Sequence, residues 1–348
     1  MQIAGLGLSP EDVIINGAVR SNTLHNNSVL TNFWRSVENL TIIPAVDSTV
    51  VWGVSQAAPL RRVHIKGNLQ IFDKGYASGG YLADSKVDGV ISSGPQQQWF
   101  TRNTIMKGWT GGVWNMFFLG VKGAPEENWP EKSYTTIDMT PVIREKPYLV
   151  FNNKEFEVRV PLLSNNTSGP SWLSGNKNEN VLKINEFYIA KPDIDNSETI
   201  NAALKKKKNI LFTPGIYSFE SSLKVINPGT LIMGLGLTSL MPVNGNPVIE
   251  VSDINGVTIC GLTIDAGLKP SETLFMVGNP GSRLSHETDP VFLYDIFFRV
   301  GGPSEGSAKS CLVINSNNVV ADHLWLWRAD HGNGVGWDKN RSANGLVV

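Results

Sequence analysis

The sequence predicts an all-β fold, a right-handed parallel β-helix built as two tandem modules. Three observations support this prediction. The composition, with 41% hydrophobic residues, 18% charged residues, Gly 34 and Pro 19, favours short strands and many turns over a helical bundle. A segment near the start of the chain recurs in its second half. Strand-like segments also follow one another at intervals of about 23 residues, which is typical of a solenoid coil.

The internal repeat indicates two modules. Residues 3–9 read IAGLGLS, and residues 232–238 read IMGLGLT. A looser match pairs residues 37–42 with residues 254–259. Because self-similarity between distant segments marks a repeated structural unit, each half of the chain is expected to form one module.

The modules have predicted bounds. Residues 1–128 form the first module, residues 129–192 a linker and residues 193–348 the second module. Within the linker, residues 145–161 predict a β-hairpin around an Asn-Asn-Lys turn, because two strand-like segments flank that turn. Residues 165–180, rich in Asn, Ser and Gly, predict an exposed loop.

The spacing of the strands favours a β-helix over other solenoids. Strand-like segments begin at Leu40 and Val63 in the first half, and at Ile296 and Val320 in the second. No helix separates them, and the Asn-centred Leu pattern of leucine-rich repeats is absent. Each coil is therefore expected to lay its strands on those of the coil before it.

A capping helix is predicted at residues 198–208, with Asn196 or Ser197 as its N-cap. One face of this helix carries the apolar side chains of Ile200, Ala203 and Leu204. Such a helix would cover the open end of the second module and block a strand edge that could otherwise pair with another chain.

The two ends of the chain are expected to lie inside a module. Residues 3–9 have no capping segment before them, whereas residues 232–238 follow a cap and a first coil. The chain also stops at Val348 in the middle of an expected strand, without a polar closing cap.

Composition and motifs exclude several functional classes. The formal net charge is −1 and basic residues are scattered apart from Lys205–Lys208, so no nucleic-acid partner is expected. No run approaches the roughly 18 apolar residues of a membrane span, and no signal peptide is visible. The sequence has no Gly-x-Ser-x-Gly element, P-loop or Cys-x-x-Cys motif, and no cofactor is expected.

Cys260 and Cys311 lie in apolar segments, which favours buried thiols, although a disulfide between them stays open.

The first candidate cluster is QQQWFTRN at residues 96–103. Amide side chains donate and accept together, which suits sugar hydroxyls, and an indole offers a flat face to a pyranose ring. The alternative is a polar ladder along stacked coils. The candidates for positioning a water or the substrate are Gln96, Gln97 and Gln98, and the candidates for binding sugar are Trp99, Arg102 and Asn103.

Two further clusters contain tryptophan. The second includes Trp114 and Asn115 as substrate-binding candidates, with a core position as the alternative for Trp114. In the third, strand alternation places Leu324 and Leu326 on one face and two tryptophans on the other, which favours a ligand-binding face. Its candidates for binding substrate are Asp322, His323, Trp325, Trp327, Asp330 and His331.

A metal site and a carboxylate pair are less well supported. The His and Asp residues of the third cluster are close only to their sequence neighbours, so no metal is expected. A glycosidase needs two suitably separated carboxyl groups, and no pair stands out among the acids of the second module. Those acids are Asp265, Asp289, Asp295, Asp322 and Asp330.

The ordered motifs resemble glycoside hydrolase family 55, the laminarinase-type exo-β-1,3-glucanases. They are QQQWFTRN at residues 96–103, VWN at 113–115 followed by GAP at 123–125, and WLWRADH at 325–331. The resemblance covers nearly the whole chain. It implies two tandem pectate-lyase-like β-helix modules and inverting cleavage of β-1,3-glucan from one end. It also implies a glutamic acid as general acid from the second module.

The resemblance assigns roles residue by residue. Gln96–Gln98 would hold the water or the terminal sugar, and Trp325, Trp327 and Asp330 would line the cleft. The sequence departs from the family pattern after WRADH, where Gly-Asn-Gly replaces a further acidic residue. The general-acid Glu would lie beyond Val348, so residues 1–348 alone are expected to be inactive.

The resemblance also implies a secreted protein with a polysaccharide as its partner, and a monomer is expected. One alternative function is a polysaccharide-binding or surface β-helix without catalysis. A polysaccharide lyase is less favoured, because no cluster combines a basic Lys or Arg with acidic calcium ligands.

Overall fold

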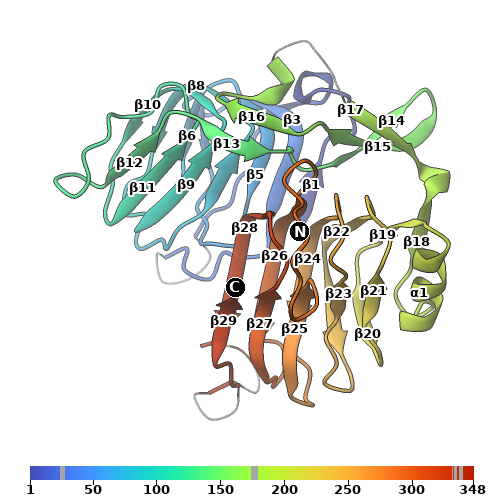
Figure 1. Cartoon of the computed structure of the whole chain (residues 1–348). Coiled ribbons are helices and arrows are strands. Elements are labelled where there is room, and N and C mark those ends of the chain that lie inside the picture. The colour runs from blue at the N-terminus through green and yellow to red at the C-terminus, as the bar shows by residue number, and fades with distance from the viewer. Residues whose placement is uncertain (24–27, 174–178, 331, 333–334, 337–339) are drawn as a thin grey trace. The chain divides into compact units, whose positions relative to one another are not determined.

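The computed structural model describes residues 1–23, 28–173, 179–330, 332, 335–336 and 340–348 (Figure 1). The chain divides into two compact units, Met1–Ile184 and Asn185–Val348. Each unit is built around parallel strands, which confirms the predicted all-β, β-helix fold class. The three-part division at residues 128 and 192 stays a prediction.

Parallel strands stacked in coils form most of the first unit. Successive coils place Val37 beside Leu60 and Leu60 beside Leu82, and all three side chains are buried in one apolar core. The strands are β1 (Gln2–Ala4), β2 (Ile14–Gly17), β3 (Ser36–Pro44), β4 (Thr49–Val51), β5 (Leu60–Ile65), β6 (Asn68–Gln70), β7 (Tyr81–Ala83), β8 (Lys86–Ser92), β9 (Gln98–Arg102), β10 (Ile105–Thr110), β11 (Asn115–Leu119) and β12 (Tyr134–Ile137).

One corner of this stack turns through left-handed backbone conformations. The corner residues are Asn39 (φ 53°), Arg62 (φ 50°), Asp84 (φ 49°), Asn103 (φ 42°) and Gly120 (φ 65°). Asn, Asp and Gly tolerate this conformation better than other residues, whereas an arginine there is uncommon. Each coil thus contributes one residue to the same corner, and four of the five carry polar side chains.

The rest of the first unit packs antiparallel strands and short helical turns against this corner. The elements are η1 (Pro10–Asp12), β13 (Thr140–Ile143), β14 (Tyr148–Asn152), β15 (Glu155–Pro161), β16 (Ser164–Thr167), η2 (Ser171–Leu173), β17 (Glu179–Lys183) and η3 (Ile184–Glu186), the last of which crosses the boundary between the units.

The predicted hairpin is confirmed. Strands β14 and β15 pair antiparallel, and the two turn residues Asn153 (φ 49°) and Lys154 (φ 69°) are both left-handed. Two such residues make the turn that best matches the twist of a hairpin. The exposed loop expected at residues 165–180 is only partly correct, because β16 pairs with β13 and β17 pairs with β15. Residues 174–178 of that loop lie outside the described residues.

The second unit contains two parallel sheets that enclose one core. One sheet has the order β18-β19-β22-β24-β26-β28 and the other β21-β23-β25-β27-β29. The elements are β18 (Phe187–Ala190), α1 (Ser197–Lys205), β19 (Asn209–Phe212), β20 (Ile216–Phe219), β21 (Leu223–Val225), β22 (Leu231–Pro242), β23 (Ile249–Val251), β24 (Thr258–Asp265), β25 (Ser271–Val277), β26 (Val291–Val300), β27 (Ala308–Ile314), β28 (Val319–Arg328) and β29 (Asn344–Val347).

The predicted capping helix is confirmed as α1, beside the first strands of the second unit (Figure 1). The side chain of Asn196 accepts hydrogen bonds of 3.0 Å from the backbone N–H groups of Glu198 and Thr199. The apolar face is buried as predicted. The helix ends at Lys205, earlier than predicted, because Lys207 adopts a left-handed conformation (φ 59°) that no helix can continue through.

The repeated Gly-Leu-Gly-Leu segments mark the same structural requirement in both units. A Cβ atom on Gly5 would lie 2.0 Å from the carbonyl oxygen of Asn39, and one on Gly234 would lie 2.5 Å from that of Gly261. Only glycine permits such an approach between neighbouring coils. Cys260 and Cys311 are buried thiols that form no disulfide, as favoured by the sequence. Among the described residues, no helix has the length and apolarity that a membrane crossing requires.

Asp253 anchors residues 278–290, the segment between β25 and β26. One carboxylate oxygen accepts hydrogen bonds of 2.8 Å from both His286 Nε2 and Ser316 Oγ. The other accepts from the backbone N–H groups of Arg283 and Leu284, at 3.2 and 3.1 Å. These donors stabilise the ionised carboxylate against the desolvation that opposes it, and they lower the pKa of Asp253 to about 2.

We predict that Asp253→Asn will lower the free energy of unfolding by about 2 kcal/mol at pH 7. Because the pKa of Asp253 is lower in the folded state than in the unfolded state, its ionised carboxylate stabilises the fold at pH values above the unfolded-state pKa. This stabilisation is lost as the pH falls through the folded-state pKa. The difference in the free energy of unfolding between Asp253→Asn and the unaltered chain should therefore shrink by about half near pH 3 and nearly vanish near pH 2. Urea unfolding followed by circular dichroism at these pH values measures it. Glu272→Gln, at a side chain that is 84% exposed, is the control, and a pH-independent deficit would contradict the prediction.

Candidate functional site

Gln96 lies inside the first unit. Its side chain is 0% exposed, and its Oε1 accepts a hydrogen bond of 2.7 Å from Gly79 N. Its Nε2 donates to Val54 O at 2.9 Å and to Ile71 O at 2.7 Å. The predicted role of Gln96 in holding a water or a sugar is therefore wrong, because its amide is fully used in joining the backbone of successive coils.

The neighbouring glutamines differ from Gln96. Gln97 is half-buried, and Gln98 is exposed at the start of β9, where it pairs with Asn115 on β11. Asn115 is half-buried, and its Oδ1 accepts a hydrogen bond of 3.1 Å from Thr135 Oγ1. The roles predicted for Gln97, Gln98 and Asn115 stay predictions.

Trp99 and Arg102 are buried and cannot present the predicted sugar-binding surface. Trp99 is 3% exposed in the core, where its ring fills the space beside Gly80, whose Cβ would lie 2.2 Å from it. Arg102 is 2% exposed and forms a two-pronged ion pair with Glu145, with both N–O distances at 2.6 Å. Both assignments are wrong because the side chains point into the unit rather than to solvent.

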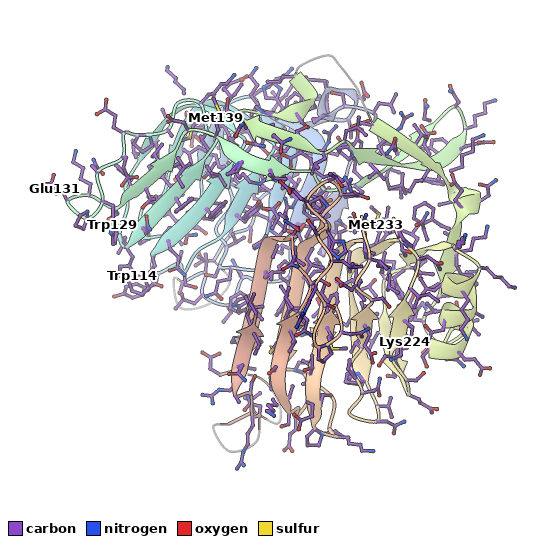
Figure 2. The ribbon with its side chains drawn as sticks, in the orientation of Figure 1. Trp114, Trp129, Glu131, Met139, Lys224 and Met233 are labelled. Carbon is purple, nitrogen blue, oxygen red and sulfur yellow. The ribbon has the colours of Figure 1, made fainter. Side chains whose placement is uncertain are left out.

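Trp114 is 56% exposed, so the core alternative is wrong for it (Figure 2). Its predicted contact with substrate stays a prediction.

A ladder of stacked aromatic rings on the same unit was not predicted. The rings of Tyr81 and Phe100 stack at 5.6 Å, and those of Phe100 and Phe117 at 5.0 Å. The signal in the sequence is the recurrence of an aromatic residue one coil apart in strands that lie in register.

The tryptophan face predicted on β28 is present. Leu324 and Leu326 pack against the core, whereas the rings of Trp325 and Trp327 stack on each other at 5.1 Å with an interplanar angle of 14°. Both tryptophans are half-buried. Arg299 lies beside Trp327 in the strand register. The neighbouring strands β26 and β28 therefore place a cation beside two aromatic rings.

Asp322 and His323 do not share the open surface of these rings. Asp322 is 6% exposed, and its predicted sugar contact stays a prediction. His323 occupies a left-handed position (φ 72°), and its Nδ1 lies 2.8 Å from Asp295 Oδ1. Asp330 is exposed, and its predicted role stays a prediction. His331 lies outside the described residues.

Two of the candidate acids of the second unit are held by basic partners. Asp265 Oδ1 and Oδ2 accept from Arg299 Nε and Nη2 at 2.5 and 2.7 Å. Asp295 is 0% exposed and contacts His323. These contacts fit structural carboxylates better than a proton donor. Within the described ranges, no group of three or more His, Cys, Asp and Glu side chains could hold a metal ion.

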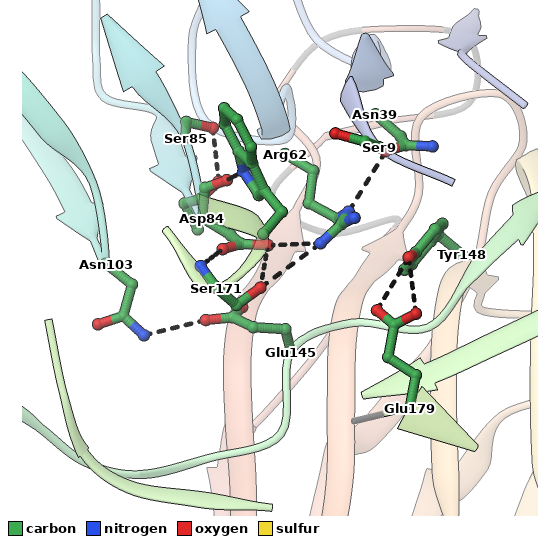
Figure 3. Close-up of polar contacts among 12 residues, drawn as sticks. Ser9, Asn39, Arg62, Asp84, Ser85, Asn103, Glu145, Tyr148, Ser171 and Glu179 are labelled. Atoms are coloured by element: carbon green, nitrogen blue, oxygen red, sulfur yellow. Dashed lines mark hydrogen bonds and ion pairs between the residues drawn. The ribbon is translucent and has the colours of Figure 1, made fainter. Parts of the chain in front are cut away.

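The first unit contains a cavity of about 440 Å³ that the sequence motifs did not reveal. Figure 3 shows polar contacts of several residues at its wall, among them Arg62, Glu145 and Tyr148. The cavity lies where the left-handed corner meets the antiparallel strands. Its wall combines charged, amide, hydroxyl and apolar groups. The lining residues are Leu8, Arg62, Asn103, Ile143, Glu145, Tyr148, Pro161, Leu162, Leu163, Ser164, Thr167, Ser168, Gly169, Pro170, Ser171, Trp172 and Glu179.

Charged groups around this cavity are buried and interact closely. Arg62 lies over the Tyr148 ring at 4.0 Å, and the Tyr148 hydroxyl lies 2.9 Å from Glu179 Oε1. Asp84 accepts from the backbone N–H of Ser171 at 2.6 Å. Burial, and next the nearby Glu145 carboxylate, raise the pKa of Asp84 to about 7, although Arg62 opposes this.

The chain was compared with known proteins. Residues 187–348 match the family model described as the LAM55 pectate lyase-like domain. The chain is 46% identical, over 99% of its length, to an exo-beta-1,3-glucanase of Streptomyces sp. (strain SirexAA-E / ActE). The structure of sacteLam55A from Streptomyces sp. SirexAA-E has a TM-score of 0.97 at 45% identity, covering 99% of this chain and 63% of that one.

A variant of the same enzyme in complex with glucose gives the same TM-score and identity. The chain spans 57% of the length of the curated glucanase that it matches. Over nearly its whole length the chain is therefore similar to the laminarinase-type glucanases, which confirms the resemblance indicated by its motifs.

Proposed function

We propose that the whole protein is an exo-acting β-1,3-glucan hydrolase. The observation that carries this proposal is the 46% identity to an exo-beta-1,3-glucanase over 99% of the chain. The glucose complex of a similar enzyme supports a glucose-containing substrate. We further propose that the protein works outside the cell as a monomer on polysaccharide, in keeping with the nature of that substrate.

The tryptophan face of β28 is proposed as a glucan-binding wall. Trp325 and Trp327 offer stacked, half-buried rings to the C–H face of a glucose unit. The guanidinium of Arg299, which Asp265 holds in place, lies beside them and can donate to sugar hydroxyls. In the first unit, Gln98 and Trp114 are exposed, and we propose each as a group that binds sugar within that unit.

Inverting hydrolysis requires one carboxylic acid to protonate the leaving oxygen and a base to activate water. Asp265 and Asp295 are engaged with basic side chains and do not suit the acid role. We propose that the proton comes from a glutamic acid of the whole protein. This residue would lie in a region that corresponds to the part of the glucanase that residues 1–348 do not match. Residues 1–348 alone should then bind glucan without releasing glucose.

The proposal predicts that Trp325→Ala combined with Trp327→Ala will weaken laminarin binding by residues 1–348 at least about tenfold, since two stacking platforms are lost. Affinity electrophoresis through laminarin-containing gels measures this change. Tyr76→Ala removes an aromatic side chain that is 70% exposed in the first unit and serves as the control. Equal binding by all three proteins would exclude the β28 face as the wall.

Catalysis needs a separate test with the whole protein. Incubation with laminarin should release glucose, and the anomeric configuration of the first product should be inverted, as proton NMR would show. Laminarin binding without any released sugar would instead indicate a polysaccharide-binding β-helix that lacks catalysis.

A further inference from the structure

The cavity of the first unit is a preformed site rather than a gap between loose side chains. Glu145 is 5% exposed and is fixed by Arg102, while Asn103 is 2% exposed and donates to Glu145 at 3.0 Å and to Thr167 at 2.9 Å. A polar wall that is held by other buried groups loses little entropy when a ligand binds. The volume of about 440 Å³ lies at the lower end of the range for small-molecule sites.

Arg62 is the group that points to a ligand. It is 5% exposed, yet its hydrogen bonds to Asn39, Asp84, Ser171 and Leu8 measure 3.3 to 3.5 Å. Charge-assisted hydrogen bonds are normally about 2.7 to 2.9 Å long. The guanidinium of Arg62 therefore retains donor capacity at the cavity wall despite its burial.

Acceptors face the same space. The Glu179 carboxylate accepts from the Tyr148 hydroxyl at 2.9 and 3.0 Å, and this single proton leaves most of its lone pairs available. Glu145 also accepts three hydrogen bonds through two oxygens and retains capacity. The wall thus offers a strong donor and two strong acceptors together.

The charges of the wall select against an ionic ligand. An anion that approached Arg62 would meet Glu145 and Glu179, and a cation would meet Arg62. A hydroxyl group avoids both costs, because it accepts from a guanidinium and donates to a carboxylate at the same time. The half-buried ring of Trp172, fixed by its 2.7 Å hydrogen bond to Asp84 O, adds an apolar surface for C–H groups.

We propose that this cavity binds a neutral polyhydroxylated molecule the size of one sugar ring. Arg62, Glu145 and Glu179 would hydrogen-bond its hydroxyls, and Trp172 would contact its C–H face. The cavity is lined by residues of the first unit and shares none with the tryptophan face of β28, and the proposal goes beyond the proposed glucan hydrolysis. It rests on that function only for the choice of glucose as the first probe.

Isothermal titration of residues 1–348 with glucose, glucuronate and glucosamine at pH 7 tests the proposal. Glucose should bind with a Kd in the range of about 1 mM, and both charged analogues should bind at least about fivefold more weakly. Glu179→Gln should weaken glucose binding at least about fivefold, because it replaces an acceptor that a hydroxyl needs. Glu155→Gln, at an exposed position on the neighbouring strand β15, should leave binding unchanged.

The outcomes separate this site from the glucan wall. The Trp325→Ala and Trp327→Ala double variant should keep glucose binding in the cavity, and Glu179→Gln should keep laminarin binding. Circular dichroism verifies that each variant is folded. Absence of saturable glucose binding in the unaltered chain, or equal binding by the Glu179→Gln and Glu155→Gln variants, would overturn the proposal without affecting the proposed hydrolase.

Discussion

Replacing Glu145 with alanine should lower the free energy of unfolding by about 4 kcal/mol at neutral pH. The Glu145 carboxylate binds Arg102 through two contacts of 2.6 Å, and Arg102 is 2% exposed. Arg102 Nε also donates to the Tyr81 hydroxyl at 3.2 Å, which is a neutral acceptor. Loss of Glu145 would thus remove the carboxylate that two nitrogens of this buried guanidinium bind, which is the costly way to break a buried ion pair.

Urea unfolding monitored by circular dichroism measures this loss. Glu272→Ala breaks an exposed ion pair with Lys309, and it should change the free energy of unfolding by less than about 1 kcal/mol. Combining Glu145→Ala with Arg102→Met should recover part of the loss, since an apolar side chain replaces the stranded charge. A deficit for Glu145→Ala no larger than that of Glu272→Ala would contradict the proposed importance of the buried pair.

The Gln96→Ala variant should be destabilised by about 3 kcal/mol. Its amide satisfies three backbone groups of successive coils, Gly79 N, Val54 O and Ile71 O. Each buried group left without a partner costs about 1 to 3 kcal/mol, and relaxation of the coils would offset part of the sum. The loss should appear as a lower urea midpoint with little change in the slope.

Gln98→Ala is the matched control for this variant, since Gln98 is exposed two positions further along the chain. Its urea midpoint should not change. The pair also separates two roles for the glutamine run. If Gln96→Ala left stability intact and altered only glucan binding, the structural role assigned to Gln96 would be wrong.

Sequence patterns predicted those parts of the fold that depend on local chemistry. The Asn196 cap and the apolar face of α1 follow from rules that involve only neighbouring residues. The opposite orientation of Leu326 and Trp327 follows from strand alternation. The recurrence of Gly5 as Gly234 reflects close approach of coils, a constraint that only glycine meets and that the sequence therefore records directly.

The orientation of β9 could not be predicted in the same way. Both faces of this strand carry aromatic residues, so the pattern does not say that Trp99 points inward and Phe100 outward. A polar run such as Gln96–Gln98 looks the same whether its amides bind backbone or sugar. The burial of Arg102 depends on Glu145, which reaches it from a distant part of the chain.

The cavity also escaped prediction, because its residues come from successive coils and from several antiparallel strands and turns between residues 143 and 179. Arg62, Asn103 and Glu179 form no local motif. The left-handed corner conformations that bring the coil residues together depend on the backbone, and an arginine at such a position gives no sequence signal.

The left-handed corner has a consequence for how this scaffold can change. The intervals between Asn39, Arg62, Asp84, Asn103 and Gly120 shorten along the chain, yet every one of these residues occupies the corner. Coil length is therefore adjusted elsewhere on the circumference, where loops tolerate insertion and deletion. A binding surface built along the corner can be altered by one residue in each coil, while the loops elsewhere in the coils lengthen or shorten independently of it.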